Sequence, residues 1–100
     1  MPKPENEKKS LLLTVVYPDR AAETLTCDAV TITVQDNKKG RGGGLYGIRP
    51  GHAPALFALD PGKAEARLDG ATVFHRTLGT GYAKVGNDRV TVITESGSED

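Results

Sequence analysis

The sequence predicts an all-β fold, a flattened β-sandwich or barrel of about eight to ten short antiparallel strands. Twelve glycines and six prolines among 100 residues point to many turns and short elements. Turn-forming pairs such as Pro18-Asp19, Asp69-Gly70 and Asn87-Asp88 recur between runs rich in Val, Thr, Ile and Leu. No window of about a dozen residues has the period of an amphipathic helix, so a helical bundle is excluded.

The strands follow in order from the runs between these turns. Val30, Ile32 and Val34 alternate with polar residues, which is the period of a half-buried strand. A similar alternation ends at Asp69-Gly70, a pair that favours a tight hairpin turn. The apolar segment 53–59 could form a short piece of helix. The expected strands are Leu11–Val16, 30–34, 64–68, 72–78 and Arg89–Thr94.

One domain is expected, spanning residues 11–95. Residues 1–10 and 96–100 are polar and carry too little apolar surface to offset the entropy of ordering them, so both are expected to be disordered tails. The longest apolar run, Ala55–Leu59, is far shorter than the roughly 18 residues of a spanning helix, and no signal peptide is recognisable. Cys27 is the only cysteine, which excludes an intramolecular disulfide. These features indicate a soluble, cytosolic protein.

The charge balance restricts the classes of partner. Thirteen basic and 13 acidic side chains leave no formal net charge, which argues against long-range attraction to nucleic acid or to an anionic membrane. The basic, glycine-rich segment 38–44 lacks the Ser or Thr and the helix of a phosphate-binding loop, and Tyr46 is the only aromatic residue nearby. A solvated loop is therefore the favoured interpretation. A small β-domain that binds nucleic acid through residues 38–44 is the alternative function.

No catalytic or metal-binding constellation can be drawn from the sequence. A metal site needs several convergent ligands, whereas the chain offers two distant histidines, His52 and His75, and one cysteine. No Ser-His-Asp or Cys-His set has a recognisable local context, although such triads assemble in space and not in sequence order. We therefore expect no metal and no cofactor, and an enzyme is the disfavoured reading.

The most informative segment is 47–54, Gly-Ile-Arg-Pro-Gly-His-Ala-Pro. Its two prolines fix φ and its two glycines free it, so the bend should hold the imidazole of His52 stiffly. A rigid loop loses little entropy on docking, which suits a recognition surface. A structural turn with a spectator histidine is equally compatible with these residues.

This segment resembles a motif of the ε-subunit family of F-type ATP synthases, Gly-Ile/Val-x-Pro-Gly-His-Ala-Pro-Leu-Leu-Thr-x-Leu-x-Pro-Gly. The first strand and the strand 30–34 are similar to the corresponding family strands. Further on, Thr80-Gly81-Tyr82-Ala83-Lys84-Val85 and Val90-Thr91-Val92-Ile93 match later parts of the pattern in the same order. The resemblance covers nearly all of residues 11–95.

The resemblance implies a sandwich of about ten strands in the central stalk of the rotor. It implies as partners the γ subunit and the c-ring, with no nucleic acid, and a non-catalytic role in coupling ion flow to ATP synthesis. The implied location is peripheral, on the cytoplasmic face of the bacterial inner membrane, with membrane contact only through the complex. We expect His52, at the tip of the loop, to share most of the binding energy with Tyr46, Ile48 and Tyr82. The implied interface residues are Tyr46, Ile48, Arg49, Pro50, Gly51, His52, Ala53, Pro54 and Tyr82.

Three features depart from the family pattern. The segment 35–44 is longer and more basic than usual. Leu45 stands where the family often has an acidic residue and Arg49 where it has an aliphatic one, so we expect contacts with the c-ring to have changed sign. The chain ends at Asp100, before the helical hairpin that inhibits ATP hydrolysis in many members. It is thus expected to be either a natural short form or a truncated one, without strong inhibition.

Overall fold

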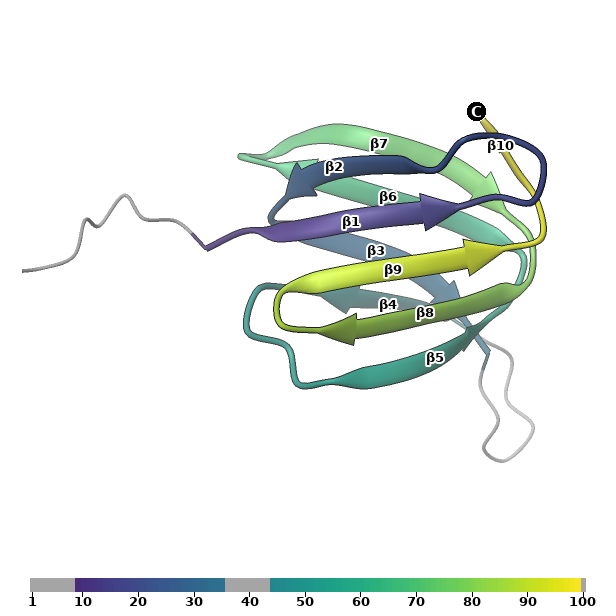
Figure 1. Ribbon diagram of the computed structural model, residues 1–100. Coiled ribbons are helices and arrows are strands. Elements are labelled where there is room, and N and C mark those ends of the chain that lie inside the picture. The colour runs from purple at the N-terminus through teal and green to yellow at the C-terminus, as the bar shows by residue number, and fades with distance from the viewer. Residues whose placement is uncertain (1–8, 36–43, 100) are drawn as a thin grey trace, which may run out of the picture.

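The computed structural model describes residues 9–35 and 44–99. These residues contain ten strands and no helix. The all-β fold expected from the sequence is therefore confirmed (Figure 1). The ten strands are β1 (Leu11–Val16), β2 (Glu23–Cys27), β3 (Ala29–Val34), β4 (Gly44–Ile48), β5 (Ala55–Leu59), β6 (Gly62–Leu68), β7 (Ala71–Leu78), β8 (Gly81–Gly86), β9 (Arg89–Thr94) and β10 (Gly97–Glu99).

The strands form one sheet that curls over itself into two layers (Figure 1). Their order is β10-β7-β6-β3-β5-β8-β9-β1-β2, and β4 pairs with β3 outside this path. We call β5, β8, β9, β1 and β2 the front layer, and β4, β3, β6, β7 and β10 the back layer. The two layers are joined between β3 and β5 through the residue pair Val34 and Leu59. The result is a sandwich that also resembles a half-barrel.

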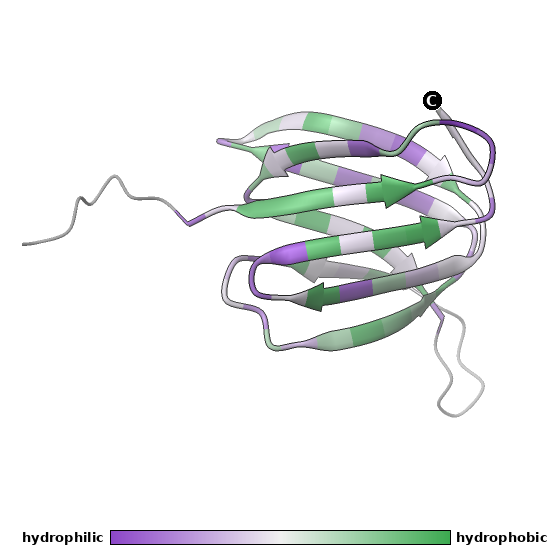
Figure 2. Ribbon diagram, in the orientation of Figure 1, coloured by the Kyte–Doolittle hydropathy of each residue, from purple (hydrophilic) through white to green (hydrophobic). Residues whose placement is uncertain are grey.

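The core lies between the two layers because the strands alternate between inward and outward side chains. On β1, Leu11, Leu13 and Val15 are buried. Figure 2 shows the alternation along several strands as changes between hydrophobic and hydrophilic colour. Burying a side chain of this size contributes roughly 1.5–3 kcal/mol each, so these inward rows are the main source of stability. The other buried hydrophobic residues are Tyr17, Cys27, Val30, Ile32, Ile48, Leu59, Ala64, Ala66, Phe74, Leu78, Ala83, Val85, Val90 and Val92.

Two tight turns form hairpins, at one position where the sequence predicted a hairpin and at one where it predicted only a turn. Asp69 and Gly70 join β6 to β7 with φ values of 53° and 82°. Asn87 and Asp88 join β8 to β9 with φ values of 52° and 57°. Two consecutive positive φ angles are characteristic of the hairpin turns that match the twist of paired strands, and Asn, Asp and Gly tolerate them best.

The expectation of uniformly antiparallel strands is wrong at one pair. β1 runs parallel to β9, with Leu13 beside Val90 and Val15 beside Val92. A parallel pair needs a long connection between its strands, and here almost the whole domain separates β1 from β9. Neither strand has a local turn that would have revealed this pairing in the sequence.

The short helix considered for residues 53–59 is also replaced by a strand. Ala55–Leu59 forms β5 and pairs antiparallel with β8, with Leu56 opposite Lys84 and Leu59 opposite Gly81. Leu59 is buried whereas Leu56 is 68% exposed, so the segment has a strand's two faces. Pairing with β8 supplies hydrogen bonds that a helix of so few residues could not match.

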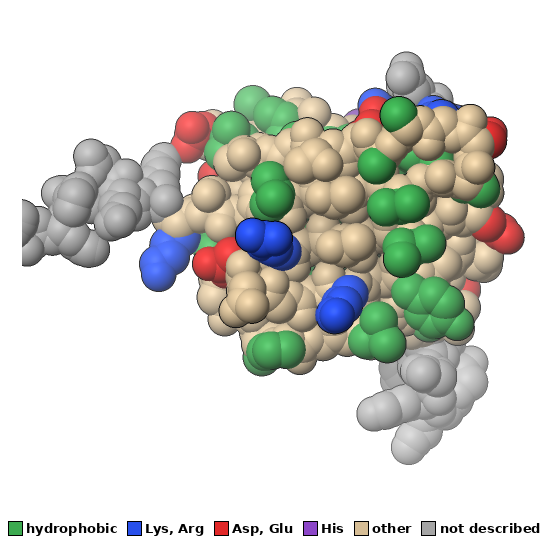
Figure 3. All heavy atoms as spheres, in the orientation of Figure 1, with side chains coloured by type: hydrophobic (Ala, Val, Ile, Leu, Met, Phe, Trp, Pro, Cys, Tyr) green, Lys and Arg blue, Asp and Glu red, His purple; other side chains and the backbone are tan. Residues whose placement is uncertain are grey.

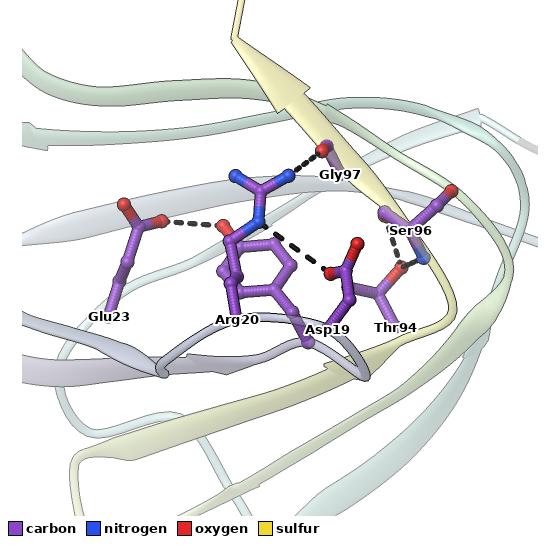
Figure 4. Close-up of polar contacts among 7 residues, drawn as sticks. Asp19, Arg20, Glu23, Thr94, Ser96 and Gly97 are labelled. Atoms are coloured by element: carbon purple, nitrogen blue, oxygen red, sulfur yellow. Dashed lines mark hydrogen bonds and ion pairs between the residues drawn. The ribbon is translucent and has the colours of Figure 1, made fainter.

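The expected disordered tail 96–100 is wrong for Gly97–Glu99, which form β10 against β7. Gly97 permits this because a Cβ there would come within 2.5 Å of the Tyr17 ring. The Arg20 guanidinium donates to the Gly97 carbonyl oxygen, and the Thr94 hydroxyl donates to the Ser96 carbonyl at 2.9 Å (Figure 4). Long-range contacts therefore order a polar segment that lacks apolar surface of its own.

Candidate docking surface

The segment 49–54, which we call the docking loop, connects β4 to β5 and contains a tight turn. The His52 amide donates to the Arg49 carbonyl at 3.2 Å, and Gly51 has a φ of 89°. Pro50 in the second position and a glycine with positive φ in the third are the pattern of a type II turn. The proline and glycine singled out in the sequence are therefore the residues that this bend requires.

His52 is held by hydrogen bonds at both ring nitrogens. Its Nδ1 lies 2.7 Å from the Ala53 carbonyl oxygen, and its Nε2 lies 2.8 Å from the Tyr46 hydroxyl. Because a carbonyl oxygen only accepts, Nδ1 donates, and the Nε2 of the neutral ring accepts the Tyr46 proton. The imidazole is half-buried. It therefore braces the loop from within, and the expectation of an imidazole presented at the loop tip does not match this geometry.

Aromatic packing reinforces this brace. The ring centroids of Tyr46 and Phe57 are 4.6 Å apart, and those of Tyr46 and His52 are 5.7 Å apart in an edge-on arrangement. These side chains come from β4, the docking loop and β5, which are not paired with one another in the sheet. Aromatic contacts of this kind add about 0.5–1.5 kcal/mol beyond the area they bury. The cluster therefore ties β4 to β5 across the docking loop.

A further hydrogen bond ties the docking loop to the front layer. The Gly51 amide donates to the Asp88 carboxylate at 2.7 Å, and Asp88 lies in the turn between β8 and β9. With this contact the loop is fixed to both layers of the sandwich. Its outward surface consists of the exposed residues Arg49, Gly51, Ala53 and Pro54.

The structure separates the expected interface residues into three groups. Ile48 is fully buried opposite Val30, so its side chain cannot form the contact expected of it. Tyr82 is 58% exposed but lies at the far end of β8 from Gly86, the residue of this strand that comes near Pro54. The structure therefore brings together Tyr46 and the docking loop, places Ile48 beneath them, and leaves Tyr82 on a different part of the surface.

Sequence reasoning missed Phe57 as a member of this site. Phe57 lies in the stretch that follows the motif, but its contact with Tyr46 depends on how β4 and β5 lie in space. An aromatic residue between two aliphatic ones was the signal available in the sequence.

A polar cluster of Tyr17, Glu23 and Arg76 lies apart from the docking loop. Arg76 contacts the Glu23 carboxylate at 2.8 Å, and the Tyr17 hydroxyl donates to the other carboxylate oxygen. Burial and the adjacent Glu23 raise the pKa of Tyr17 to about 12. Burial opposes ionisation of Glu23, but the hydrogen bonds from Tyr17 and Arg76 outweigh it and lower its pKa. The cluster thus holds one paired carboxylate between β2 and β7.

The cysteine and the possible metal ligands considered in the sequence analysis do not form a reactive site in the described residues. Cys27 is buried, and burial raises the pKa of its thiol. In residues 9–35 and 44–99 no three His, Cys, Asp or Glu side chains gather as a metal site would require. The same residues contain no helix that could cross a membrane. The basic segment 38–44 lies outside the described residues except for Gly44, which begins β4.

Comparison with known proteins identifies the domain. The family described as the β-sandwich domain of the ATP synthase delta/epsilon chain matches residues 10–99. The ATP synthase epsilon chain of Lawsonia intracellularis is 38% identical over 89 residues, which cover 89% of this chain and 61% of that protein. The epsilon chain of an Anaeromyxobacter strain is 32% identical over 87 residues, covering 87% of this chain and 60% of that protein. This chain thus spans about three fifths of the length of these relatives.

Solved structures share the fold at lower identity. A chain in the mitochondrial ATP synthase of Euglena gracilis aligns with a TM-score of 0.73 and 22% identity, covering 98% of this chain and 62% of that one. A chain in the central stalk and c-ring of the Tetrahymena thermophila mitochondrial ATP synthase aligns with a TM-score of 0.66 and 13% identity, covering 92% and 68%. These structures share the fold, and the family match over residues 10–99 shows that the chain belongs to the ATP synthase delta/epsilon chain family, with the β-sandwich domain of that family.

Proposed function

We propose that this chain is a non-catalytic central-stalk subunit that docks the γ subunit onto the c-ring and helps couple ion translocation to ATP synthesis. The observation that carries the proposal is a docking loop braced from both layers of a sandwich that belongs to the epsilon family. A peripheral position on the cytoplasmic face of a bacterial inner membrane follows from the same assignment, with the partners providing the attachment.

The scaffold has the stiffness that a rotor part needs. Backbone hydrogen bonds link each strand to its neighbours, and the two layers share one core. Torque applied at the docking loop would reach β4 and β5 through the chain itself, and β8 and β9 through the Gly51–Asp88 hydrogen bond. A load at this edge is therefore shared by both layers.

The docking loop offers a small, preformed contact surface. Arg49, Ala53 and Pro54 are exposed, so the loop presents one cation and two compact apolar side chains. Leu45, on the adjoining strand β4, is 60% exposed and extends the apolar part. A partner that fits this surface combines a carboxylate or carbonyl oxygen with a shallow apolar hollow. Because the loop is already ordered, little conformational entropy is lost on docking.

Co-purification with the γ subunit and with the c-ring tests the proposal. The wild-type chain should bind purified γ and should join the c-ring when γ is present. Failure to bind either partner would overturn the proposal. His52→Ala should weaken docking by about tenfold, because the loop loses its brace and must be ordered on binding.

Tyr46→Phe is the matched control for the brace. It removes only the hydroxyl that donates to Nε2 and keeps the ring that contacts Phe57. We expect a smaller loss of affinity than for His52→Ala, with both variants folded by circular dichroism. If His52→Ala binds both partners as the wild type does, the docking loop is not the contact surface.

A further inference from the structure

A hollow on the outer face of the front layer is lined mainly by hydrogen-bond donors. Its volume is about 430 Å³, and its lining residues are Lys84, Gly86, Asn87, Arg89 and Thr91. All five come from β8, from β9 or from the turn that joins these strands. Figure 3 shows this face, with basic side chains over β8 and β9. The volume lies within the range of small-molecule sites, which is roughly 300–1,000 Å³.

The register of the β8–β9 hairpin explains why a hollow forms here. Lys84 is opposite Thr91 in this ladder. Gly86 is opposite Arg89, and it has no side chain to fill the space beside the guanidinium. Side chains of β-strands alternate between the two faces, and the residues between these outward positions are buried. Asn87 lines the hollow from the turn, where its φ is 52°.

The four side chains that line the hollow are all donors, and the fold leaves them unused. The Lys84 ammonium and the Arg89 guanidinium only donate, and the Asn87 amide and the Thr91 hydroxyl both donate and accept. Within residues 9–35 and 44–99 none of these four side chains has a hydrogen-bond or ion-pair partner. Thr14, the neighbour of Thr91 on β1, is by contrast 3.3 Å from a hydroxyl on β2. The donors of the hollow are therefore available to a ligand.

The positions around the hollow supply no carboxylate for its two cations. Leu56 lies beside Lys84 on β5, and Leu12 lies beside Arg89 on β1. Asp88, in the turn, does not line the hollow, and its Oδ1 accepts a hydrogen bond at 2.7 Å from the docking loop. Electrostatic complementarity therefore favours an anionic ligand. The outward residues of the front layer, none of them acidic, are Leu56, Ala58, Tyr82, Lys84, Gly86, Arg89, Thr91, Ile93, Leu12, Thr14, Val16, Thr24 and Thr26.

We propose that this hollow binds a dianionic phosphate group, either free phosphate or the phosphate of a small ester. The planar guanidinium of Arg89 can donate to two phosphate oxygens, and Lys84 adds a second positive charge. Thr91 and Asn87 can donate to the remaining oxygens. A tetrahedral oxyanion offers acceptors in several directions, as donors from two strands and a turn require, whereas the two oxygens of a carboxylate lie in one plane. Binding of this kind needs no other subunit and does not depend on the proposed function.

The exposure of the two cations sets the expected strength of binding. Lys84 and Arg89 are exposed, so water and salt screen their attraction for an anion. We therefore expect a dissociation constant of the order of 1 mM, which rises with added salt. A phosphate ester should bind more tightly than free phosphate where its organic part contacts Leu56 or Leu12, the apolar neighbours of the two cations.

The test is a titration of the full chain with sodium phosphate, followed by NMR of the backbone amides. At about pH 8 phosphate is mainly a dianion, and sodium chloride at the same ionic strength is the reference. The amide signals of Lys84, Asn87 and Arg89 should shift and reach saturation with phosphate, and should not do so with chloride. The double variant Lys84→Gln/Arg89→Gln should bind phosphate at least about tenfold more weakly than the wild type.

Lys63→Gln/Arg67→Gln is the matched control. It removes the same two kinds of charge from β6, where both side chains are exposed on the outer face of the back layer. This variant should bind phosphate within about twofold of the wild type. Both double variants should be folded, which the unshifted signals of core residues in the same spectra will show.

Absent shifts, shifts that chloride reproduces, or equal weakening in the two double variants would overturn the phosphate site, because general ionic effects would then account for any binding. Saturation by citrate at lower concentrations than by phosphate would overturn it in favour of a polycarboxylate. Tighter binding of glycerol 3-phosphate than of free phosphate supports an ester as the ligand, and equal or weaker binding supports the free anion. Neither γ nor the c-ring takes part in these measurements, so a negative result leaves the proposed function standing.

Discussion

Replacing Ile48 and Tyr82 by alanine should separate a core role from a docking role within the same set of interface candidates. Ile48 has no exposed surface and faces the core beside Val30. Truncating a fully buried isoleucine costs roughly 2–5 kcal/mol, because apolar contacts are lost and a cavity is left. At about 3 kcal/mol, the melting temperature of a domain of this size should fall by roughly 12–24 °C.

Tyr82→Ala should leave the fold almost unchanged. Tyr82 is 58% exposed on the outer face of β8, and substitutions at such positions usually change the free energy of unfolding by less than about 0.5 kcal/mol. The family resemblance implies that Tyr82 is an interface residue. Its removal should therefore weaken the binding of γ by more than about 1 kcal/mol, which is roughly fivefold.

Two measurements on each variant decide the matter. Thermal unfolding by circular dichroism gives stability, and titration with purified γ, at a temperature where both variants are folded, gives affinity. Ile48→Ala should lose stability and keep most of its affinity, and Tyr82→Ala should do the reverse. A Tyr82→Ala protein as unstable as Ile48→Ala, or a folded Ile48→Ala protein with the larger loss of affinity, would refute this division.

The remaining predictions concern stability. Because the pKa of Tyr17 is raised from 10.0 to about 12, the stability it contributes is present below pH 10 and is lost as the pH rises toward 12, by at most about 3 kcal/mol; Tyr17→Phe should remove this part of the alkaline decline in urea unfolding, and an unchanged decline would contradict the assignment. Because the pKa of Glu23 is lowered, its contribution is present above its ordinary value of 4.5 and is lost as the pH falls through the lowered value; Glu23→Gln should flatten the acid side of the same profile, and an acid limb as steep as that of the wild type would argue against it. Gly81→Ala would place a Cβ 1.9 Å from the Ile93 carbonyl oxygen and should cost about 1–3 kcal/mol or more in thermal unfolding, whereas Gly86→Ala, whose nearest neighbour is 4.0 Å away, should cost less; equal losses would show that the close approach is not the cause.

The fold class was accessible from the sequence because its causes are local. The alternation of Val30, Ile32 and Val34 and the positive φ angles suited to Asp69-Gly70 depend on neighbouring residues only, and the structure confirms both. The docking loop was accessible for the same reason, since Pro50 and Gly51 specify their turn wherever it occurs. The resemblance to the family motif indicated, in addition, which family the domain belongs to.

Only the tertiary structure decided which face each of these residues occupies. Ile48 and Tyr46 are two positions apart and share the inward face, yet Ile48 lies in the core and Tyr46 reaches the imidazole of His52. The parallel pairing of β1 with β9 and the ordering of β10 against β7 both arise between segments far apart in the sequence. Strand register is set by the buried face of the whole sheet, so a short sequence pattern determines a strand but not its neighbours.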